Sequence, residues 1–399
     1  MSNEIIITTK KSMKKYFIIA IAALAASAAC SKVETIDNTP DVPVTFQAAN
    51  YTGQTKAGEV SVLDDFTAFK CKAYLHAQGI DLDASGNVNG TSYQNVFGTD
   101  GETISVDDAA NPTEWAPSHT YYWPKGTQSF VNFIGWYGTD GTNDVDPTIT
   151  YAYDGTASKY KATMVWNYTT VSGDAATNLL YADMAWRFKS NNDPATYGVS
   201  GASEGVPMLF HHALAQINVK VYADGTSLTA GSGTVSDANA TWTIALETPK
   251  ITPVYNAGTL TLTNEDPGTA ATEQAWTGSW AGTGSTGDIA ASNLNVDKVT
   301  KATANTLFNA TCVVPQTIGA TVKLTFNMRI TTTYKTAPTN PNTELIPVEI
   351  TLNEMGTTAW AQNTKYTYYI KIVPSQNEVL FDPALEADWT EIEGTEKEI

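Results

Sequence analysis

Residues 321–330 have the sequence TVKLTFNMRI, in which apolar and polar side chains alternate. Successive side chains of a β-strand point to opposite faces, so the five apolar residues of this segment are expected on one face. They are Val322, Leu324, Phe326, Met328 and Ile330. The same period of two recurs at 216–221, 366–372 and 69–75, and it predicts β-strands throughout the chain. No long helix is predicted.

Short turns separate these segments, for example at Asp154-Gly155 and Asp224-Gly225. Strands with one apolar face, joined by short turns, predict antiparallel sheets packed as β-sandwiches. Residues 190–205 (SNNDPATYGVSGASEG) are polar and rich in turn formers, which predicts a domain boundary there. We therefore expect an N-terminal β-sandwich domain at 30–205 and a C-terminal one at 206–399. A second Gly/Thr/Ser-rich stretch, 263–293, contains Trp276 and Trp280 and predicts a long loop.

The N-terminus has the pattern of an export signal. Four lysines between residues 10 and 15 precede the apolar run 16–29 (YFIIAIAALAASAA), which is too short to span a bilayer as a stable helix. This order predicts a secretory signal peptide at 1–29. Small residues lead directly to Cys30, as in a bacterial lipobox, although Ser27 stands where that pattern usually has Leu. We predict lipidation (palmitate) at Cys30, with cleavage by an ordinary signal peptidase as the alternative.

The lipid anchor and the charge of the chain limit where the protein resides and what it binds. More than one acyl chain gives stable anchoring. By resemblance to bacterial lipoproteins, Ser31 in place of Asp favours the outer membrane. The formal charge is −18, which argues against nucleic acid and anionic membrane surfaces as partners. Cys71 and Cys312 are expected as two separate buried thiols, although the sequence leaves their pairing open.

Motifs that would indicate catalysis or a bound cofactor are not found. His211 and His212 are neighbours, and adjacent strand residues point to opposite faces, so they do not predict a metal site. Asp81-x-Asp83-x-Ser85-Gly86 imitates the start of a calcium loop, but the twelfth position is Ser92 instead of Glu. A turn is the better interpretation. The sequence predicts no enzyme, no metal and no cofactor.

One region of the chain is crowded with aromatic residues, among them Trp115, Tyr121, Tyr122, Trp123, Trp136, Tyr137, Trp166 and Tyr168. If exposed, these aromatic side chains would form a glycan-binding platform, with Trp115 and Trp166 as the contact residues. If buried, they are sandwich core, because Trp and Tyr combine a large apolar surface with one polar group. We favour the core interpretation and keep a stand-alone outer-membrane lipoprotein that binds glycans as the alternative function.

Several segments resemble the fimbrillin family of Bacteroidetes, in particular its Mfa-like branch. They are 121–125 (YYWPK), 129–137 (SFVNFIGWY), 206–221 (VPMLFHHALAQINVKV), 313–316 (VVPQ), 360–372 (WAQNTKYTYYIKI) and Asp388-Trp389. Together, in this order along the chain, they span most of residues 40–390. The resemblance implies two transthyretin-like β-sandwich domains and a structural subunit of a type V surface pilus, as stalk, tip or anchor. It implies a fimbrium on the outer membrane, adhesion to host or bacterial surface ligands, and partner subunits bound by strand exchange.

The resemblance also implies processing by a surface protease that cuts after a basic residue and removes the first strand. Here that strand would be residues 42–47, with Val42, Val44 and Phe46 on one face; Pro43 suggests a sheet edge. The following loop, 50–58 (NYTGQTKAG), contains one basic residue, which predicts a cut between Lys56 and Ala57.

Two features bear on that processing and on the strand that would follow it. No Arg precedes Arg187, so an Arg-specific protease could not act in the loop, and an uncleaved anchor or tip subunit stays open. The predicted donor strand lies near the C-terminus, where Leu385, Ala387 and Trp389 alternate with acidic residues.

Overall fold

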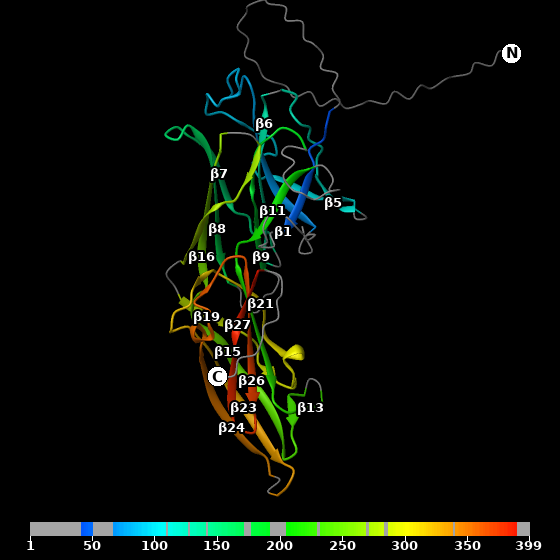
Figure 1. The fold of residues 1–399 in the computed structure, drawn as a ribbon, viewed down its shortest axis with the longest axis vertical. Helices are drawn as coiled ribbons and strands as arrows, with labels where there is room; N and C mark the ends of the chain where they lie inside the picture. The colour runs from blue at the N-terminus through cyan, green and yellow to red at the C-terminus, as the bar shows by residue number, and fades with distance from the viewer. Residues whose placement is uncertain are drawn as a thin grey trace, which may run out of the picture. The chain divides into compact units, whose positions relative to one another are not determined.

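The computed structural model describes residues 41–50, 67–108, 111–126, 128–140, 143–170, 177–191, 205–229, 232–268, 271–282, 286–337 and 340–388. All of them belong to the unit Asp41–Ile399. Within these ranges the helical elements are two short 3₁₀ turns, η1 (Lys301–Thr303) and η2 (Leu352–Met355), and none of them is long and apolar enough to cross a membrane. The prediction of an all-β protein is confirmed (Figure 1).

A ten-stranded sheet, built mostly from the first half of the chain, has the order β17-β10-β6-β9-β11-β1-β5-β4-β2-β3. Its strands are β1 (Phe46–Asn50), β2 (Ala68–His76), β3 (Gln94–Asn95), β4 (Glu102–Asp108), β5 (Asn111–Pro117), β6 (Phe130–Asp140), β9 (Thr177–Ala182), β10 (Met184–Phe188), β11 (Val206–His212) and β17 (Thr272–Gln274). An additional pairing joins β6 to β2. Strands β6, β9, β11, β1, β5, β4 and β2 therefore form a closed ring of pairings, which the expectation of open sandwich sheets does not include.

The remaining strands form four sheets. One has the order β18-β16-β8-β7, one β21-β12-β26-β27, and one β13-β14-β15-β23-β24 with β19 and β20 also on β15; β22 pairs with β25. The bounds are β7 (Thr148–Asp154), β8 (Lys159–Thr169), β12 (Ala215–Ala223), β13 (Thr226–Thr229), β14 (Thr234–Ser236), β15 (Ala240–Tyr255), β16 (Ala257–Glu265), β18 (Thr277–Gly282), β19 (Thr286–Ala290), β20 (Leu294–Asn295), β21 (Asn305–Val313), β22 (Gln316–Thr317), β23 (Lys323–Tyr334), β24 (Asn342–Thr351), β25 (Ala359–Trp360), β26 (Thr364–Val373) and β27 (Glu378–Asp388).

Two ladders are parallel, so the expectation of purely antiparallel sheets is wrong for them. β1 pairs with β11, and β12 pairs with β26. Parallel neighbours cannot be joined by a tight hairpin and need a long connection. In both pairs the partners are more than 130 residues apart in the chain. The local alternation that identifies a strand contains no information about such a partner.

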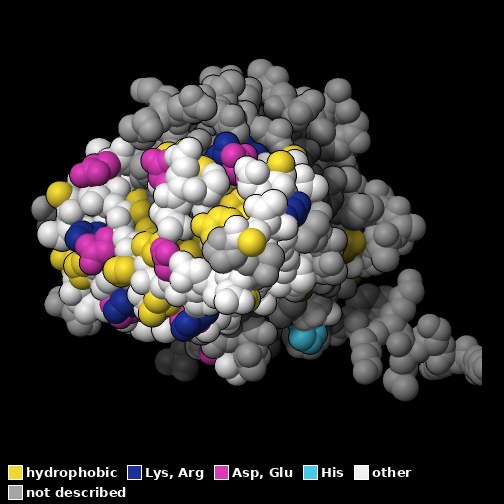
Figure 2. Space-filling model, turned by 90° about the horizontal axis from the view of Figure 1, so that it is seen from below, with side chains coloured by type: hydrophobic (Ala, Val, Ile, Leu, Met, Phe, Trp, Pro, Cys, Tyr) yellow, Lys and Arg dark blue, Asp and Glu magenta, His cyan; other side chains and the backbone are white. Residues whose placement is uncertain are grey.

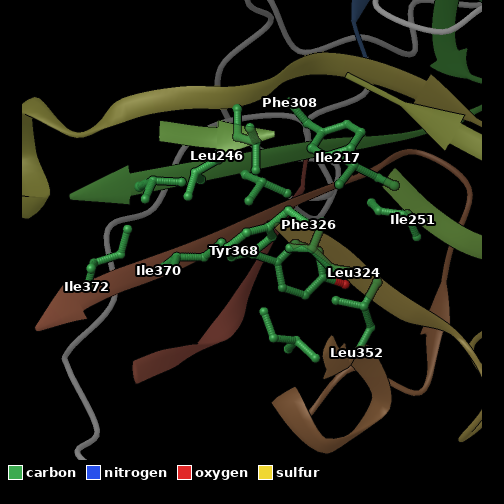
Figure 3. Close-up of a cluster of buried hydrophobic side chains, with 14 of the residues drawn as sticks. Ile217, Leu246, Ile251, Phe308, Leu324, Phe326, Leu352, Tyr368, Ile370 and Ile372 are labelled. Carbon is green, nitrogen blue, oxygen red and sulfur yellow. The ribbon is translucent and has the colours of Figure 1, made fainter. Parts of the chain in front are cut away.

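The segment 321–330 forms most of β23, and its alternation is confirmed by burial. Its apolar side chains are 0–6 % exposed. They share one core with residues of β12, β15 and β26, so the seven-stranded sheet packs against the sheet that contains β12 and β26. Figure 3 shows Phe326 and Tyr368 directed into this core.

The predicted long loop at 263–293 is wrong, because β17, β18 and β19 all lie within it. Its tryptophans bind main-chain carbonyls of distant residues: Trp276 Nε1 donates to Ala182 O at 2.8 Å, and Trp280 Nε1 donates to Ala213 O at 2.6 Å. Composition alone suggested a loop, whereas Thr is also suited to strands. β16 and β18 join β8 in one sheet, so strand pairings link segments on the two sides of residue 205. The domain boundary predicted there stays a prediction.

Cys71 and Cys312 are both buried and form no disulfide, which confirms the expectation of two separate thiols. Burial raises the pKa of the Cys71 thiol well above its usual value. On the surface, acidic and basic side chains lie next to each other on the face shown in Figure 2. Exposed pairs such as Lys323–Glu349 and Lys250–Asp288 have this arrangement.

Candidate functional site

The segment 41–50, which includes β1, is the candidate site because the sequence predicts that it is exchanged. β1 lies between two neighbours in the ring of pairings. It runs parallel to β11 over five register pairs, from Phe46 opposite Val206 to Asn50 opposite Phe210. Its pairing with β5 is a single register pair, Phe46 opposite Trp115. The predicted edge position is therefore wrong, because the strand has a partner on each side (Figure 1).

Two side chains fix this segment in the core. Val44 is 5 % exposed and Phe46 is fully buried, whereas Val42 is 48 % exposed. The ring of Phe46 meets Phe133 edge-to-face at 5.4 Å between centroids and Phe69 at 6.1 Å. Such aromatic pairs contribute about 0.5–1.5 kcal/mol beyond their buried area. The expected apolar face therefore holds for Val44 and Phe46 but not for Val42.

The main chain of residues 42–45 binds a different partner on each side. On one side, Val44 N donates to Tyr121 O at 2.8 Å, and Trp123 N donates to Val42 O at 3.0 Å. The YYWPK segment therefore pairs with the residues before β1. Lys125 adds an ion pair to Asp41 at 3.0 Å.

On the other side, one side chain replaces a neighbouring strand. Asn191 Nδ2 donates to Pro43 O at 2.9 Å, and Asn191 Oδ1 accepts from Thr45 N at 3.2 Å. The same Oδ1 accepts from Trp123 Nε1 at 2.7 Å. Two residues after Pro43, the main-chain ladder with β11 begins, because Val206 N donates to Thr45 O at 2.8 Å.

Gly205 allows the close approach of β1 and β11. A Cβ atom at this residue would lie 2.8 Å from the carbonyl carbon of Phe46 and about as close to its Cα and O. Real Cβ contacts are essentially never this short, so any larger residue would force the two strands apart. Asn191 and Gly205 lie in the polar stretch 190–205 that predicts a domain boundary, and neither residue carries a local signal for this role.

Several predicted site residues lie outside the described ranges: the signal peptide 1–29, Cys30, Lys56, Ala57 and Trp389. Their predicted roles stay predictions. Leu385 and Ala387 lie in β27, which pairs with β26 of the same chain; Leu385 is opposite Thr367, and Ala387 is opposite Lys365. Donation to another subunit would therefore require β27 to leave β26.

The two proposed glycan contacts are inside the protein. Trp115 is 2 % exposed and Trp166 is 1 % exposed, and each lies in a hydrophobic core. Buried rings offer no face on which a sugar could stack, so these residues do not form a platform in the folded chain. Their burial agrees with the core interpretation of the aromatic cluster.

A buried polar cluster that no sequence motif predicted surrounds His76. His76 Nδ1 lies 2.5 Å from Asp81 Oδ2, and His76 Nε2 lies 2.7 Å from Tyr151 Oη. Tyr160 Oη also donates to Asp81 Oδ2, at 3.1 Å, and Ala77 N donates to Asp81 Oδ1 at 3.2 Å. Both oxygens of Asp81 therefore accept protein hydrogen bonds, and the turn of the calcium-like pattern is closed by Asp83, whose Oδ1 accepts from Ser85 N and Asn87 N.

A second group of polar residues, Ser118, His119 and Glu102, contains the residue types of a hydrolytic triad without its geometry. His119 Nδ1 lies 3.3 Å from Ser118 Oγ and 3.0 Å from Glu102 Oε1, so both groups approach the same ring nitrogen. A triad relay needs the nucleophile and the acid on opposite nitrogens. Over the described part of the chain, no group of three or more His, Cys, Asp or Glu residues could hold a metal ion.

Comparison with known proteins identifies the family. The family model described as "Fimbrillin-like" matches residues 80–389. The chain belongs to this fimbrillin-like family, and the resemblance drawn from the short segments is confirmed. Membership supports a structural role in a surface fimbrium or in adhesion rather than catalysis.

Three solved structures that are similar to the chain come from Bacteroides and Parabacteroides species. A candidate cell adhesion protein from Bacteroides uniformis is 18% identical with a TM-score of 0.41, and 87% of this chain and 99% of that chain are covered. A fimbrial protein from Bacteroides vulgatus is 17% identical with a TM-score of 0.46 and the same coverage. A fimbrial assembly protein from Parabacteroides distasonis is 11% identical with a TM-score of 0.32, again at 87% and 99%. No curated protein matches the chain.

Proposed function

We propose that the protein is a structural subunit of a cell-surface pilus, assembled by strand donation and supporting adhesion. The segment 41–50 is the strand given up, and the segment around Leu385, Ala387 and Trp389 is the strand donated to the next subunit. Subunits joined head to tail in this way extend into an open filament. Strand addition derives affinity from main-chain hydrogen bonds and specificity from pockets for alternate side chains.

The observation that carries the proposal is the position of the segment 41–50. Its strand β1 completes the ring of pairings yet contacts β5 through one register pair, and the segment fills the core with Val44 and Phe46. Its removal would leave an apolar groove between β11 and the YYWPK segment. The predicted donor has the same alternation, with Ala387 and Trp389 matching Val44 and Phe46 in spacing.

Electron microscopy and mass spectrometry of surface material test this proposal together. We expect filaments that contain the protein, with mature N-termini at Ala57 after a cut at Lys56. Filaments in which Cys30 is still joined to residue 57 in every subunit would exclude exchange by cleavage at Lys56. Cells that make the protein but show no filaments containing it would contradict the pilus role itself.

The proposal includes export and anchoring through a lipid on Cys30 at the outer membrane. We expect wild-type protein to incorporate labelled palmitate and to sediment with membranes. Cys30→Ala should abolish both, because an unacylated chain lacks the hydrophobic anchor. Cys71→Ala is the matched control, since that thiol is buried, and it should leave labelling unchanged. Labelling that persists in Cys30→Ala would contradict the anchor site.

A further inference from the structure

Asn191 occupies the place of a neighbouring strand. In an extended segment, alternate residues direct their main-chain groups to opposite sides. Val42 and Val44 use the main chain of Tyr121 and Trp123 on one side. Pro43 and Thr45 face the other side, where the amide of Asn191 supplies one donor and one acceptor.

This amide extends the β11 ladder beyond the start of the strand. The first main-chain bond from β11 is Val206 N to Thr45 O. Asn191 binds the next main-chain groups along the same side, accepting from Thr45 N and donating to Pro43 O. Its side chain therefore provides the donor and acceptor that a further residue of β11 would otherwise supply.

Trp123 fixes the amide in the orientation that this role requires. The indole Nε1–H donates to Asn191 Oδ1 at 2.7 Å, and Trp123 is 8 % exposed. An indole N–H is only a donor, so it selects the oxygen of the amide and directs the Nδ2 group to Pro43 O. The amide contacts main-chain atoms of residues 43 and 45, so the side chains at these two positions do not determine the contact.

We propose that Asn191, oriented by Trp123, is a main-chain recognition residue that binds any extended strand in this groove: first the chain's own segment 43–45 and then the donor strand of a second copy. The second half rests on the proposed function. With Ala387 at the position of Val44 and Trp389 at that of Phe46, Asn191 Nδ2 would donate to Glu386 O. Its Oδ1 would accept from Asp388 N.

Residue-resolved amide hydrogen exchange on the full chain tests the first half. In Asn191→Ala we expect the Thr45 amide to exchange about tenfold faster, the effect of losing one hydrogen bond. Asn191→Asp retains the acceptor oxygen, so it should preserve Thr45 protection better than Ala does. The amide of Ala223, which donates to Lys298 O in another part of the fold, reports general destabilisation.

Asn264 offers a matched control variant. Its Oδ1 accepts from Trp186 Nε1 at 2.8 Å, and its Nδ2 donates to Gln274 O at 2.9 Å, so it is a second Trp–Asn pair away from β1. Asn264→Ala should leave the ratio of Thr45 to Ala223 exchange unchanged. If Asn191→Ala also leaves that ratio unchanged, the recognition role is overturned.

Filament stability tests the second half. Wild-type and Asn191→Ala filaments are heated in detergent, and the fraction released as monomers is measured. We expect Asn191→Ala filaments to release monomers at a lower temperature than wild type or Asn264→Ala. Equal release by all three overturns the role in donor binding. Absence of filaments in wild type refutes the proposed function and with it the donor half, while the exchange ratio still decides the role toward segment 43–45.

Discussion

Replacing Phe46 by Ala should remove the main apolar contact that holds the first strand. The side chain is fully buried and its ring meets Phe133, Phe69 and Phe97 at 5.4, 6.1 and 6.4 Å between centroids. Truncation of a buried Phe to Ala costs about 3–5 kcal/mol, through lost transfer energy and the cavity that remains. We expect a cost within this range, because three aromatic neighbours lose an edge contact at once.

Urea unfolding of the full chain measures the free energy, and amide exchange at Val44 and Val206 measures local opening of β1. Val42→Ala is the control, because Val42 is 48 % exposed and surface substitutions usually change stability by less than about 0.5 kcal/mol. Phe46→Leu retains most of the volume and should cost less than Ala. The reasoning is refuted if Phe46→Ala and Val42→Ala reduce stability equally, or if exchange at Val44 is unaffected.

Three further substitutions test other parts of the structure. Burial, with Lys365 and His211 nearby, lowers the pKa of His212 from 6.5 to about 3. As the pH falls below 6.5 the unfolded chain therefore takes up the proton first, and the free energy of unfolding decreases by about 1.4 kcal/mol per pH unit down to about pH 3. His212→Gln should remove that part of the pH slope in unfolding titrations. Asp266 binds the Arg187 guanidinium, which is 13% exposed, bidentately at 2.7 and 2.8 Å. Asp266→Ala leaves that guanidinium without its carboxylate, which should lower the free energy of unfolding in urea by about 3–5 kcal/mol. Glu247→Ala, at the exposed pair with Arg329, should cost far less. Gly205→Ala should cost about 1–3 kcal/mol and raise exchange at Val206, since the added Cβ meets the main chain of Phe46; unchanged protection would contradict the close approach.

The period of two predicted where strands occur because the signal is local. In β23 and the residue Val322 just before it, each apolar side chain of 321–330 faces the core, as the alternation requires. The same reasoning could not predict that β1 pairs in parallel with β11, because a register is set by contacts between distant segments. Only the inward face was predictable from the residues, and even there Val42 departs from the pattern.

The polar stretches were the least predictable part of the chain. Residues 190–205 have the composition of a linker, yet Asn191 binds the main chain of the first strand and Gly205 permits its approach to β11. Residues 263–293 have the composition of a loop, yet Trp276 binds Ala182 O of β9, far away in the chain. Polar and small residues suit both turns and main-chain contacts, and three-dimensional proximity decides which role they have.

The two strands in the proposed exchange differ in how many neighbours they have. Within the described ranges β27 is the end of its sheet and pairs with β26 alone, so its departure breaks one ladder. The place of β1 has β11 on one side and the YYWPK segment and β5 on the other, with the amide of Asn191 continuing the β11 side. A strand that leaves a sheet edge and enters this groove would exchange one ladder for contacts on two sides, and each net main-chain bond contributes about 0.5–1.5 kcal/mol. Once β1 is absent, an inserted strand would regain main-chain partners on both sides of the groove, and the pockets of Val44 and Phe46 add the selection for a small and a large apolar side chain two residues apart.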